Sequence, residues 1–278
     1  MQNNLTTPLP IEAVPPYVAP ASQAAPKEII LLSWAAPLLW LRLGWRDLAA
    51  RPATSLFYGL PFWCMALVLH TVFHAEPEYM MTMVSGCLLI GPFVAMGLYD
   101  LSHRREQGLA ADFMASLTCW KRHLRSMGML VGVLMVLELL WGRVSLVLIA
   151  LFFDTGMPSS VDVMQTLLDP DNREFVAAYL VIGGVFSMLV FAISVVSIPM
   201  ILDRDTDAIT AAITSIEVVT NNTAVMLLWA ALLALLVTLS LLLPLAVGLI
   251  VAGPLLGHAS WHAYRGSVRW LAAARPGL

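Results

Sequence analysis

Long apolar runs, separated by short polar connectors, fill most of the chain. Four of these runs are close to or above the ~20 residues that a helix needs to cross a hydrocarbon core about 30 Å thick. They extend over residues 53–74, 80–99, 127–153 and 175–202. A transmembrane barrel would instead alternate apolar and polar residues in segments of about ten. The pattern therefore predicts an all-α, polytopic transmembrane helical bundle.

The last apolar run, Thr223–Tyr264, is too long for a single crossing. At about 1.5 Å per residue it would give a helix of about 63 Å, twice the thickness of the hydrocarbon core. Pro244 lies near its middle and is a natural break, because proline removes a helical hydrogen bond. The run is thus interpreted as two spans joined by a tight turn, which gives six spans in all.

The placement of basic residues supports this count. With six spans, every lysine and arginine except Arg143 and Arg173 falls on the same side of the membrane. With five, Arg265, Arg269 and Arg275 would lie on the opposite side. Because basic residues concentrate in cytoplasmic loops, six spans with both termini in the cytoplasm are expected.

The remaining segments complete the predicted organisation. Residues 1–28 are rich in proline and alanine and predict a disordered cytoplasmic tail, and residues 266–278 a second tail. The membrane domain covers 52–265. The two cytoplasmic connectors, at 100–126 and 203–222, carry apolar residues at helical spacing, and each predicts a short amphipathic helix.

An amphipathic helix in the plane of the membrane interface is predicted over residues 29–51. This segment combines tryptophans with arginines and is interrupted by a proline, so it lacks the apolar length of a span. Aromatic and basic side chains are typical of headgroup depth. The residues expected to contact headgroups or a protein interface are Trp34, Trp40, Trp45, Arg42 and Arg46.

Composition narrows the functional classes. The chain is 59% hydrophobic and 12% charged, whereas a soluble domain has about 25% charged residues. No basic run indicates nucleic-acid binding, and the cysteines have no metal-binding spacing. Neither a phosphate loop nor an HExxH or GxSxG element is present, so we expect neither an enzyme nor a bound cofactor or metal.

Two ionisable residues lie inside the third apolar run. Glu138 is about 17 Å along this span, at a depth where carboxylates usually face the bundle interior or a water-filled cavity. It is a candidate proton or ion relay, or alternatively a neutral carboxyl hydrogen-bonded to a serine or a carbonyl. Arg143 is rotated from it by about 140° on the helix, so the two are not expected to pair, and Arg143 is expected to reach the outer headgroups.

His258 and His262 are four residues apart, on one face of the sixth span. Two histidines at this spacing can ligate a metal or a haem iron, although no further ligand is identifiable. The alternative is an ordinary polar belt near the cytoplasmic surface. His70 and His74 repeat the spacing at the opposite end of the first span.

Four stretches together resemble DUF2189, a family of bacterial integral membrane proteins. They are WLRLGWRDLAARP (40–52), GPFVAMGLYDLSHRRE (91–106), FAISVVSIPMILDRDTDAITAAITSI (191–216) and GPLLGHASWHAYR (253–265). The resemblance implies a bacterial inner-membrane location and supplies no catalytic residues. Members are sometimes labelled as cytochrome c oxidase subunit I-like, but that subunit uses six histidine ligands, and two of the six histidines here, His103 and His123, lie in a polar connector.

Two functions are therefore considered. The first is a non-catalytic accessory or assembly partner of a larger membrane complex, such as a respiratory or cytochrome oxidase assembly. The expected partners of the protein are then the lipid bilayer and other membrane-protein subunits. The second is a small-solute or proton-coupled transporter that uses Glu138.

Overall fold

The structure, a computed structural model, describes residues 27–76, 79–110, 112–153 and 169–271. Helices account for nearly all of the described chain. In order, the elements are β1 (Lys27–Ile29), α1 (Ala36–Ala50), α2 (Pro52–Ala75), α3 (Met80–Glu106), α4 (Phe113–Thr118), the 3₁₀ turn η2 (Cys119–His123), α5 (Leu124–Phe152), η3 (Pro170–Asn172), α7 (Arg173–Ser194), α8 (Ser197–Arg204), α9 (Ala208–Asn221), α10 (Thr223–Leu242), η4 (Pro244–Ala246), α11 (Leu249–Ser267) and β2 (Val268–Trp270).

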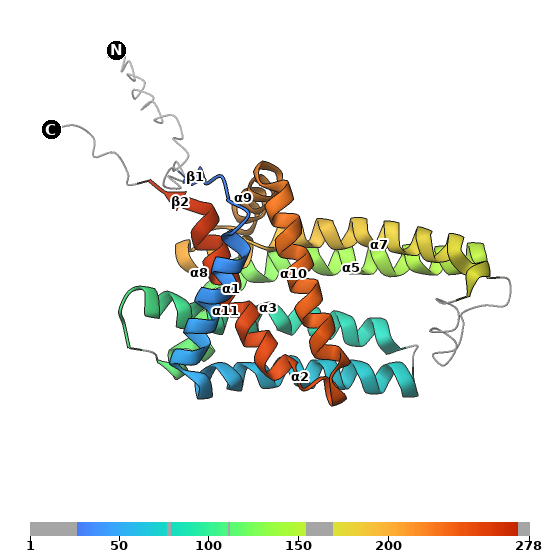
Figure 1. The fold of residues 1–278 in the computed structure, drawn as a ribbon, viewed down its shortest axis with the longest axis horizontal. Coiled ribbons are helices and arrows are strands. Elements are labelled where there is room, and N and C mark those ends of the chain that lie inside the picture. Colours follow the sequence, from blue (N-terminus) through green and yellow to red (C-terminus); the bar gives the residue numbers. More distant parts are fainter. Residues whose placement is uncertain (1–26, 77–78, 111, 154–168, 272–278) are drawn as a thin grey trace, which may run out of the picture.

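Four long helices form the body of the molecule. In Figure 1, α2, α3, α5 and α7 extend along the same axis, while α1, α10 and α11 cross them obliquely. Neighbouring long helices contact one another in the order α2, α3, α5 and α7, and α11 packs against α1, α2 and α3. The all-α, polytopic prediction is confirmed.

Within the described residues, five helical stretches are long and apolar enough to cross a membrane. They are Pro52–Ala75, Met80–Glu106, Phe113–Phe152, Pro170–Arg204 and Thr223–Leu242. The sixth predicted span corresponds to α11, which has 19 residues but carries polar side chains such as His258 and His262. The count of six stays a prediction.

The break predicted at Pro244 is present. α10 ends at Leu242, and the chain reverses through η4, where Leu245 and Ala246 adopt positive φ angles of 55° and 54°. The fourth predicted span is also broken, because α7 ends at Ser194 and α8 begins at Ser197. Pro199 accounts for this second break, because it has no N–H to donate to the carbonyl of Val195, four residues earlier, and its ring crowds that carbonyl.

The predicted tails contribute a structured element. Lys27–Ile29 pairs in antiparallel fashion with Val268–Trp270, so the tail boundaries at 28 and 266 were wrong by a few residues. Residues 1–26 and 272–278 of the predicted tails lie outside the described residues. The pairing joins the two ends of the described chain at one end of the bundle.

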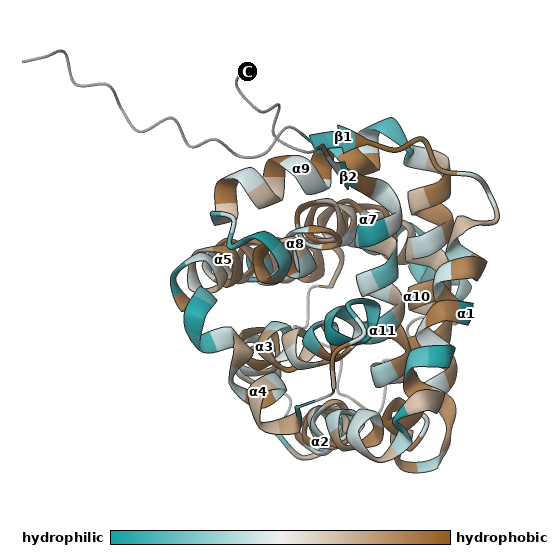
Figure 2. Ribbon diagram, turned by 90° about the vertical axis from the view of Figure 1, so that its left-hand side faces the viewer, coloured by the Kyte–Doolittle hydropathy of each residue, from teal (hydrophilic) through white to brown (hydrophobic). Residues whose placement is uncertain are grey.

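The best-buried part of the protein is at the end of the bundle that carries this sheet. Figure 2 looks onto this end, where hydrophilic residues lie on α11 between its neighbours. Trp229, Trp261 and Tyr264 are fully buried there. By contrast, leucines and valines on α5, α7 and α10 are widely exposed, as expected for surfaces that face lipid.

Close backbone approach joins α11 to its neighbours. A Cβ placed on Gly59 of α2 would lie 2.0 Å from the carbonyl oxygen of Ile250. One placed on Gly44 of α1 would lie 2.7 Å from the backbone nitrogen of Ala259. Because only glycine fits at such contacts, these two positions fix α11 against α1 and α2.

Candidate functional sites

Glu138 is buried inside α5 and faces α3. Its side chain accepts a hydrogen bond of 2.9 Å from the Ser85 hydroxyl, which also donates to the backbone carbonyl of Met81. The residue is 9% exposed, and its second oxygen, Oε1, is buried without a hydrogen-bond partner. A buried polar atom of this kind is unusual in a native fold and calls for an explanation.

Glu138 also lines a groove of about 800 Å³ between α3, α5 and α7. Most of its lining residues are apolar. The polar groups in its walls belong to Glu138, Tyr179 and two serines of α7, Ser187 and Ser194. Trp141 and Tyr179 stack edge-on at one side, with ring centroids 5.0 Å apart. A Cβ added at Gly184 would meet no atom within 4 Å, so the α7 wall faces open space.

Arg143 lies on a different face of α5. Its side chain is exposed, and no ion pair joins it to Glu138, although both belong to the described part of the chain. The structure thus agrees with the expected separation of these residues. Headgroup contact by Arg143 stays a prediction.

Of the segment predicted as a helix over 29–51, Ala36–Ala50 forms α1, whereas Ile29 belongs to β1 and residues 30–35 are not helical. Trp34 and Trp45 are 66% and 52% exposed, and Arg42 and Arg46 are exposed as well. The prediction that Trp40 contacts headgroups was wrong. Its side chain is 2% exposed and packs edge-on against Trp229, with 5.5 Å between the ring centroids. The spacing of apolar residues along α1 did not predict which face of the helix is buried. Gly44 allows the face that carries Trp40 to pack against α11.

The second amphipathic connector also turns an apolar face outward. α9 buries Ala211, Thr214 and Val218, while Ile209 and Ile213 are 62% and 51% exposed. The first connector forms α4 and η2, as predicted in outline.

A buried polar network surrounds His258. Its Nε2 lies 3.0 Å from the Ser55 hydroxyl of α2, and its Nδ1 lies 2.7 Å from the Ser102 hydroxyl of α3. Ser102 in turn donates to Oδ2 of Asp47, on α1, over 2.6 Å. The network therefore ties four helices together through side chains that sequence analysis did not connect.

Asp47 is the anionic centre of this network. Besides Ser102, it accepts hydrogen bonds from Nε2 of His262 at 2.8 Å and from the Arg105 guanidinium. Burial raises the pKa of the Asp47 carboxyl, but the hydrogen bonds from His262 and Ser102 outweigh it and hold this pKa below its ordinary value of 3.8.

The histidine pair is therefore committed to protein contacts. Both ring nitrogens of His258 have hydroxyl partners, and Nε2 of His262 is bonded to Asp47. Ligation of haem by His258 would require at least one of these bonds to break. Among the described residues, no group of three or more histidine, cysteine, aspartate or glutamate side chains is arranged to hold a metal. Haem binding stays an untested alternative.

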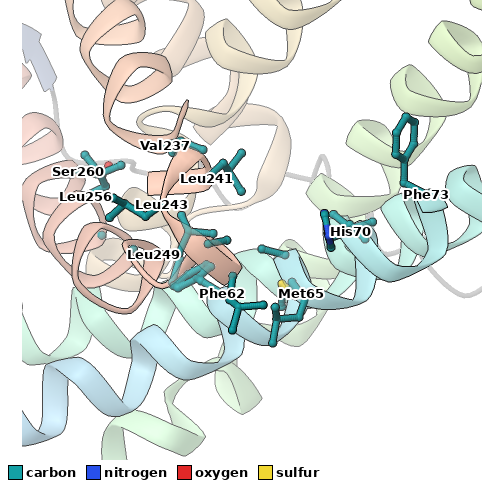
Figure 3. A pocket seen from close by; sticks show the side chains of 18 of the residues that line it. Phe62, Met65, His70, Phe73, Val237, Leu241, Leu243, Leu249, Leu256 and Ser260 are labelled. Carbon is teal, nitrogen blue, oxygen red and sulfur yellow. The ribbon is translucent and has the colours of Figure 1, made fainter. Parts of the chain in front are cut away.

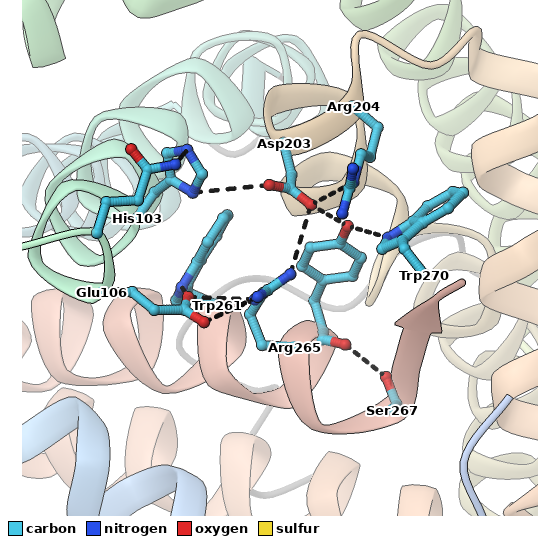
Figure 4. Close-up of polar contacts among 10 residues, drawn as sticks. His103, Glu106, Asp203, Arg204, Trp261, Arg265, Ser267 and Trp270 are labelled. Carbon is cyan, nitrogen blue, oxygen red and sulfur yellow. Dashed lines mark hydrogen bonds and ion pairs between the residues drawn. The ribbon is translucent and has the colours of Figure 1, made fainter. Parts of the chain in front are cut away.

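A second polar cluster lies beside the network, at the same end of the bundle. Figure 4 shows Arg265 between Glu106 and Asp203, with 2.9 Å from its Nη2 to Glu106. Tyr264 donates to Asp203 over 2.6 Å, and Trp261 donates to Glu106 over 3.1 Å. These contacts connect α3, α8 and α11.

Another cavity, with mostly apolar walls, lies between α2, α3, α10 and α11. It has a volume of about 810 Å³. In Figure 3, Phe62, Met65 and Phe73 of α2 lie on one side and Leu241 and Leu249 on the other. It brings together few polar groups, so we do not assign it a chemical role.

The four stretches that carry the family resemblance converge at one end of the bundle. Asp47, Ser102, Asp203 and His258 come one from each stretch, and all belong to the two polar clusters. The signal in the sequence was the recurrence of polar residues at the ends of apolar runs. Ser55 had no such signal, because serine is common inside helical spans.

Comparison with protein families gives one match. A family described as "Predicted integral membrane protein (DUF2189)" matches residues 80–203. This segment extends from α3 into α8 and therefore contains Glu138, the groove and, from the polar clusters, Ser102, Arg105, Glu106 and Asp203. No curated protein and no solved structure matches the chain.

Proposed function

Since residues 80–203 match the DUF2189 family of predicted integral membrane proteins, we propose that the protein acts inside the bilayer as an accessory or assembly partner of a larger membrane complex. The observation that supports this role is the groove at Glu138. It lies within the family segment and combines an unpartnered carboxyl oxygen with an open, small-residue wall.

The proposed occupant of the groove is a single transmembrane helix of a partner protein. Gly184 and Ser187 leave room for a second backbone to approach α7, as small residues do at helix interfaces in membranes. Glu138 then requires a hydrogen-bond donor, because its Oε1 has no partner among the residues that the structure describes. A helix with a lysine, arginine or amide side chain near mid-depth has the matching chemistry.

Native purification tests this proposal. The protein is extracted from its own membranes in a mild detergent, and co-purifying proteins are identified by mass spectrometry. Gly184→Leu fills the groove, whereas Gly132→Leu adds the same side chain to an exposed site on α5 that does not line it. We expect the first variant alone to lose a stoichiometric membrane partner. Recovery of the protein without any partner contradicts the proposal.

The nature of the complex is a finer proposal. A respiratory or cytochrome oxidase assembly and a bacterial inner-membrane location are implied by the family resemblance alone. The identity of the co-purifying subunits tests the proposed complex and the proposed location. Oxidase subunits of the inner membrane would support both proposals, and an unrelated complex would contradict the first.

A second candidate is a small-solute or proton-coupled transporter. It is favoured by the same observation, a deep carboxyl that contacts a groove large enough for a small solute. Glu138→Gln should then abolish proton-coupled flux in reconstituted vesicles. The two roles are distinguishable, because loss of a partner is measured on the complex and loss of flux on the isolated protein.

A further inference from the structure

A small polar pocket lies among α1, α2, α3 and α11, apart from the groove at Glu138. Its volume is about 250 Å³, and its lining includes Ser55, His258, Asp47, Arg51 and Arg105. Ser55 and His258 are each 1% exposed as residues, yet both contribute to the pocket wall. The pocket therefore places a hydroxyl and an imidazole, already hydrogen-bonded to each other, beside two guanidinium groups.

The hydrogen-bond partners fix the direction of every proton in this chain of contacts. An ionised Asp47 only accepts, so the single Ser102 hydroxyl proton is directed to Asp47. Ser102 must then accept from His258, which places the imidazole proton on Nδ1. Nε2 of His258 is left as an acceptor, and Ser55 donates to it over 3.0 Å.

This arrangement has the parts of an activated nucleophile. A serine lies within hydrogen-bond reach of a base, and a third group orients that base, which is the geometric signature of nucleophilic catalysis by serine. Here the third group is the Ser102 hydroxyl, which links His258 to the negative charge of Asp47.

We propose that Ser55 is the nucleophile of an acyl-transfer site, with His258 as its general base, and that the substrate is the carboxylic ester of an anionic amphiphile at the membrane surface. This activity is separate from the partner role proposed above. The absence of sequence motifs does not bear on it, because Ser55, Ser102 and His258 come from three separate helices.

The chemical step balances without any additional reactant except water. Ser55 Oγ forms a bond to the ester carbonyl carbon, and its proton passes to Nε2 of His258. The bond from that carbon to the alcohol oxygen then breaks, and the departing alcohol takes the proton from His258. Water then gives a proton to Nε2 of His258 and adds to the acyl carbon. The bond from that carbon to Ser55 Oγ breaks, Ser55 takes the proton back from His258, and the released acid loses its own proton to solvent.

The surroundings of the pocket select the substrate class. Arg51 supplies positive charge for a phosphate or another anionic headgroup, whereas Arg105 is already paired with Asp47. Leu109, which is 54% exposed, lines the same pocket and offers an apolar surface. Ser55 lies in the first turn of α2, which begins at Pro52.

A fluorophosphonate probe tests the nucleophile directly on the full chain in detergent. We expect covalent labelling of the wild-type protein, located at Ser55 by mass spectrometry of its peptides. Ser55→Ala should abolish labelling, and Ser85→Ala, which removes a hydroxyl bonded to an acid outside this pocket, should leave it unchanged. Locating the adduct in the wild type keeps the test valid even if a variant fails to fold.

The substrate class is tested with vesicles of phosphatidylglycerol, with release of free fatty acid as the readout. Ser55→Ala should lower the release at least tenfold. Ser102→Ala, at a positioning residue, should lower the labelling rate and change its pH profile while the protein stays folded. Absence of an adduct at Ser55 in the folded wild type, or release that is unaffected by Ser55→Ala, would overturn the proposal.

Discussion

Ser85 on α3 and Glu138 on α5 are joined by a hydrogen bond of 2.9 Å, and this contact leaves one oxygen of the carboxyl without a partner. A fold optimised for stability alone would pair that oxygen or replace the carboxyl by an apolar side chain. The unpaired oxygen beside an open groove is therefore the feature on which the proposed partner role depends.

Glu138→Gln should separate folding from function. The amide keeps an acceptor oxygen for Ser85, so we expect the thermal unfolding temperature in detergent to stay nearly unchanged. Ser85→Ala removes the donor and should cost about 1 kcal/mol, the net value of a typical hydrogen bond. A large loss of stability in the glutamine variant would show that the carboxylate charge is required by the fold itself.

Gly59→Ala should strongly destabilise the protein. The added Cβ would lie 2.0 Å from the Ile250 carbonyl oxygen, so α2 and α11 would have to move apart. Overpacking of this kind costs about 1–3 kcal/mol. Gly132→Ala is the matched control, because its Cβ meets nothing within 4 Å, and it should change the unfolding free energy by less than about 1 kcal/mol.

The start of α9 is held by the Asp207 side chain, which accepts hydrogen bonds from the backbone N–H groups of Ile209 and Thr210. Asp207→Ala should therefore destabilise this helix by about 1 kcal/mol, measured as faster amide hydrogen exchange within Ala208–Asn221. Asp207→Asn retains the acceptor and should behave like the wild type. Equal exchange in all three proteins would show that packing alone fixes the helix.

Asp47 predicts a particular response to acid. In the folded protein the pKa of Asp47 lies below its ordinary value of 3.8. The ionised carboxylate therefore contributes its full stabilisation at pH values above 3.8, and this stabilisation is lost as the pH falls through the lower pKa of the folded state. Asp47→Asn should cost about 1.5–3 kcal/mol at neutral pH. It should also weaken the pH dependence of unfolding below about pH 4. If the pH dependence of unfolding is the same in the variant, the acid sensitivity of the protein comes from other carboxyl groups.

Sequence periodicity was sufficient to predict the helices but not their partners. The apolar runs and Pro244 located the long helices, because span length and helix breaks depend on local chemistry. Trp40 was misplaced because which face of α1 is buried depends on Gly44 meeting Ala259, a contact between distant segments. The same limit applies to the strand pairing of Lys27–Ile29 with Val268–Trp270.

The candidate sites were predictable to different degrees. Glu138 is easy to identify in the sequence, because an acidic residue inside an apolar run is energetically costly and therefore rare. Its contact with Ser85 could not be predicted, since it requires the register of α3 against α5. For His258 the spacing to His262 suggested ligation, whereas the structure directs both side chains to protein partners from other helices.

Site-specific photo-crosslinking in living cells tests the central claim, the occupied groove, most directly. A photoreactive amino acid is placed at Leu180, which lines the groove, and separately at Val136, an exposed residue on α5 that does not line it. The account predicts one discrete protein adduct from position 180, lost on combination with Glu138→Gln, and none from position 136. Only lipid adducts from both positions, or a protein adduct that is independent of Glu138, would contradict it.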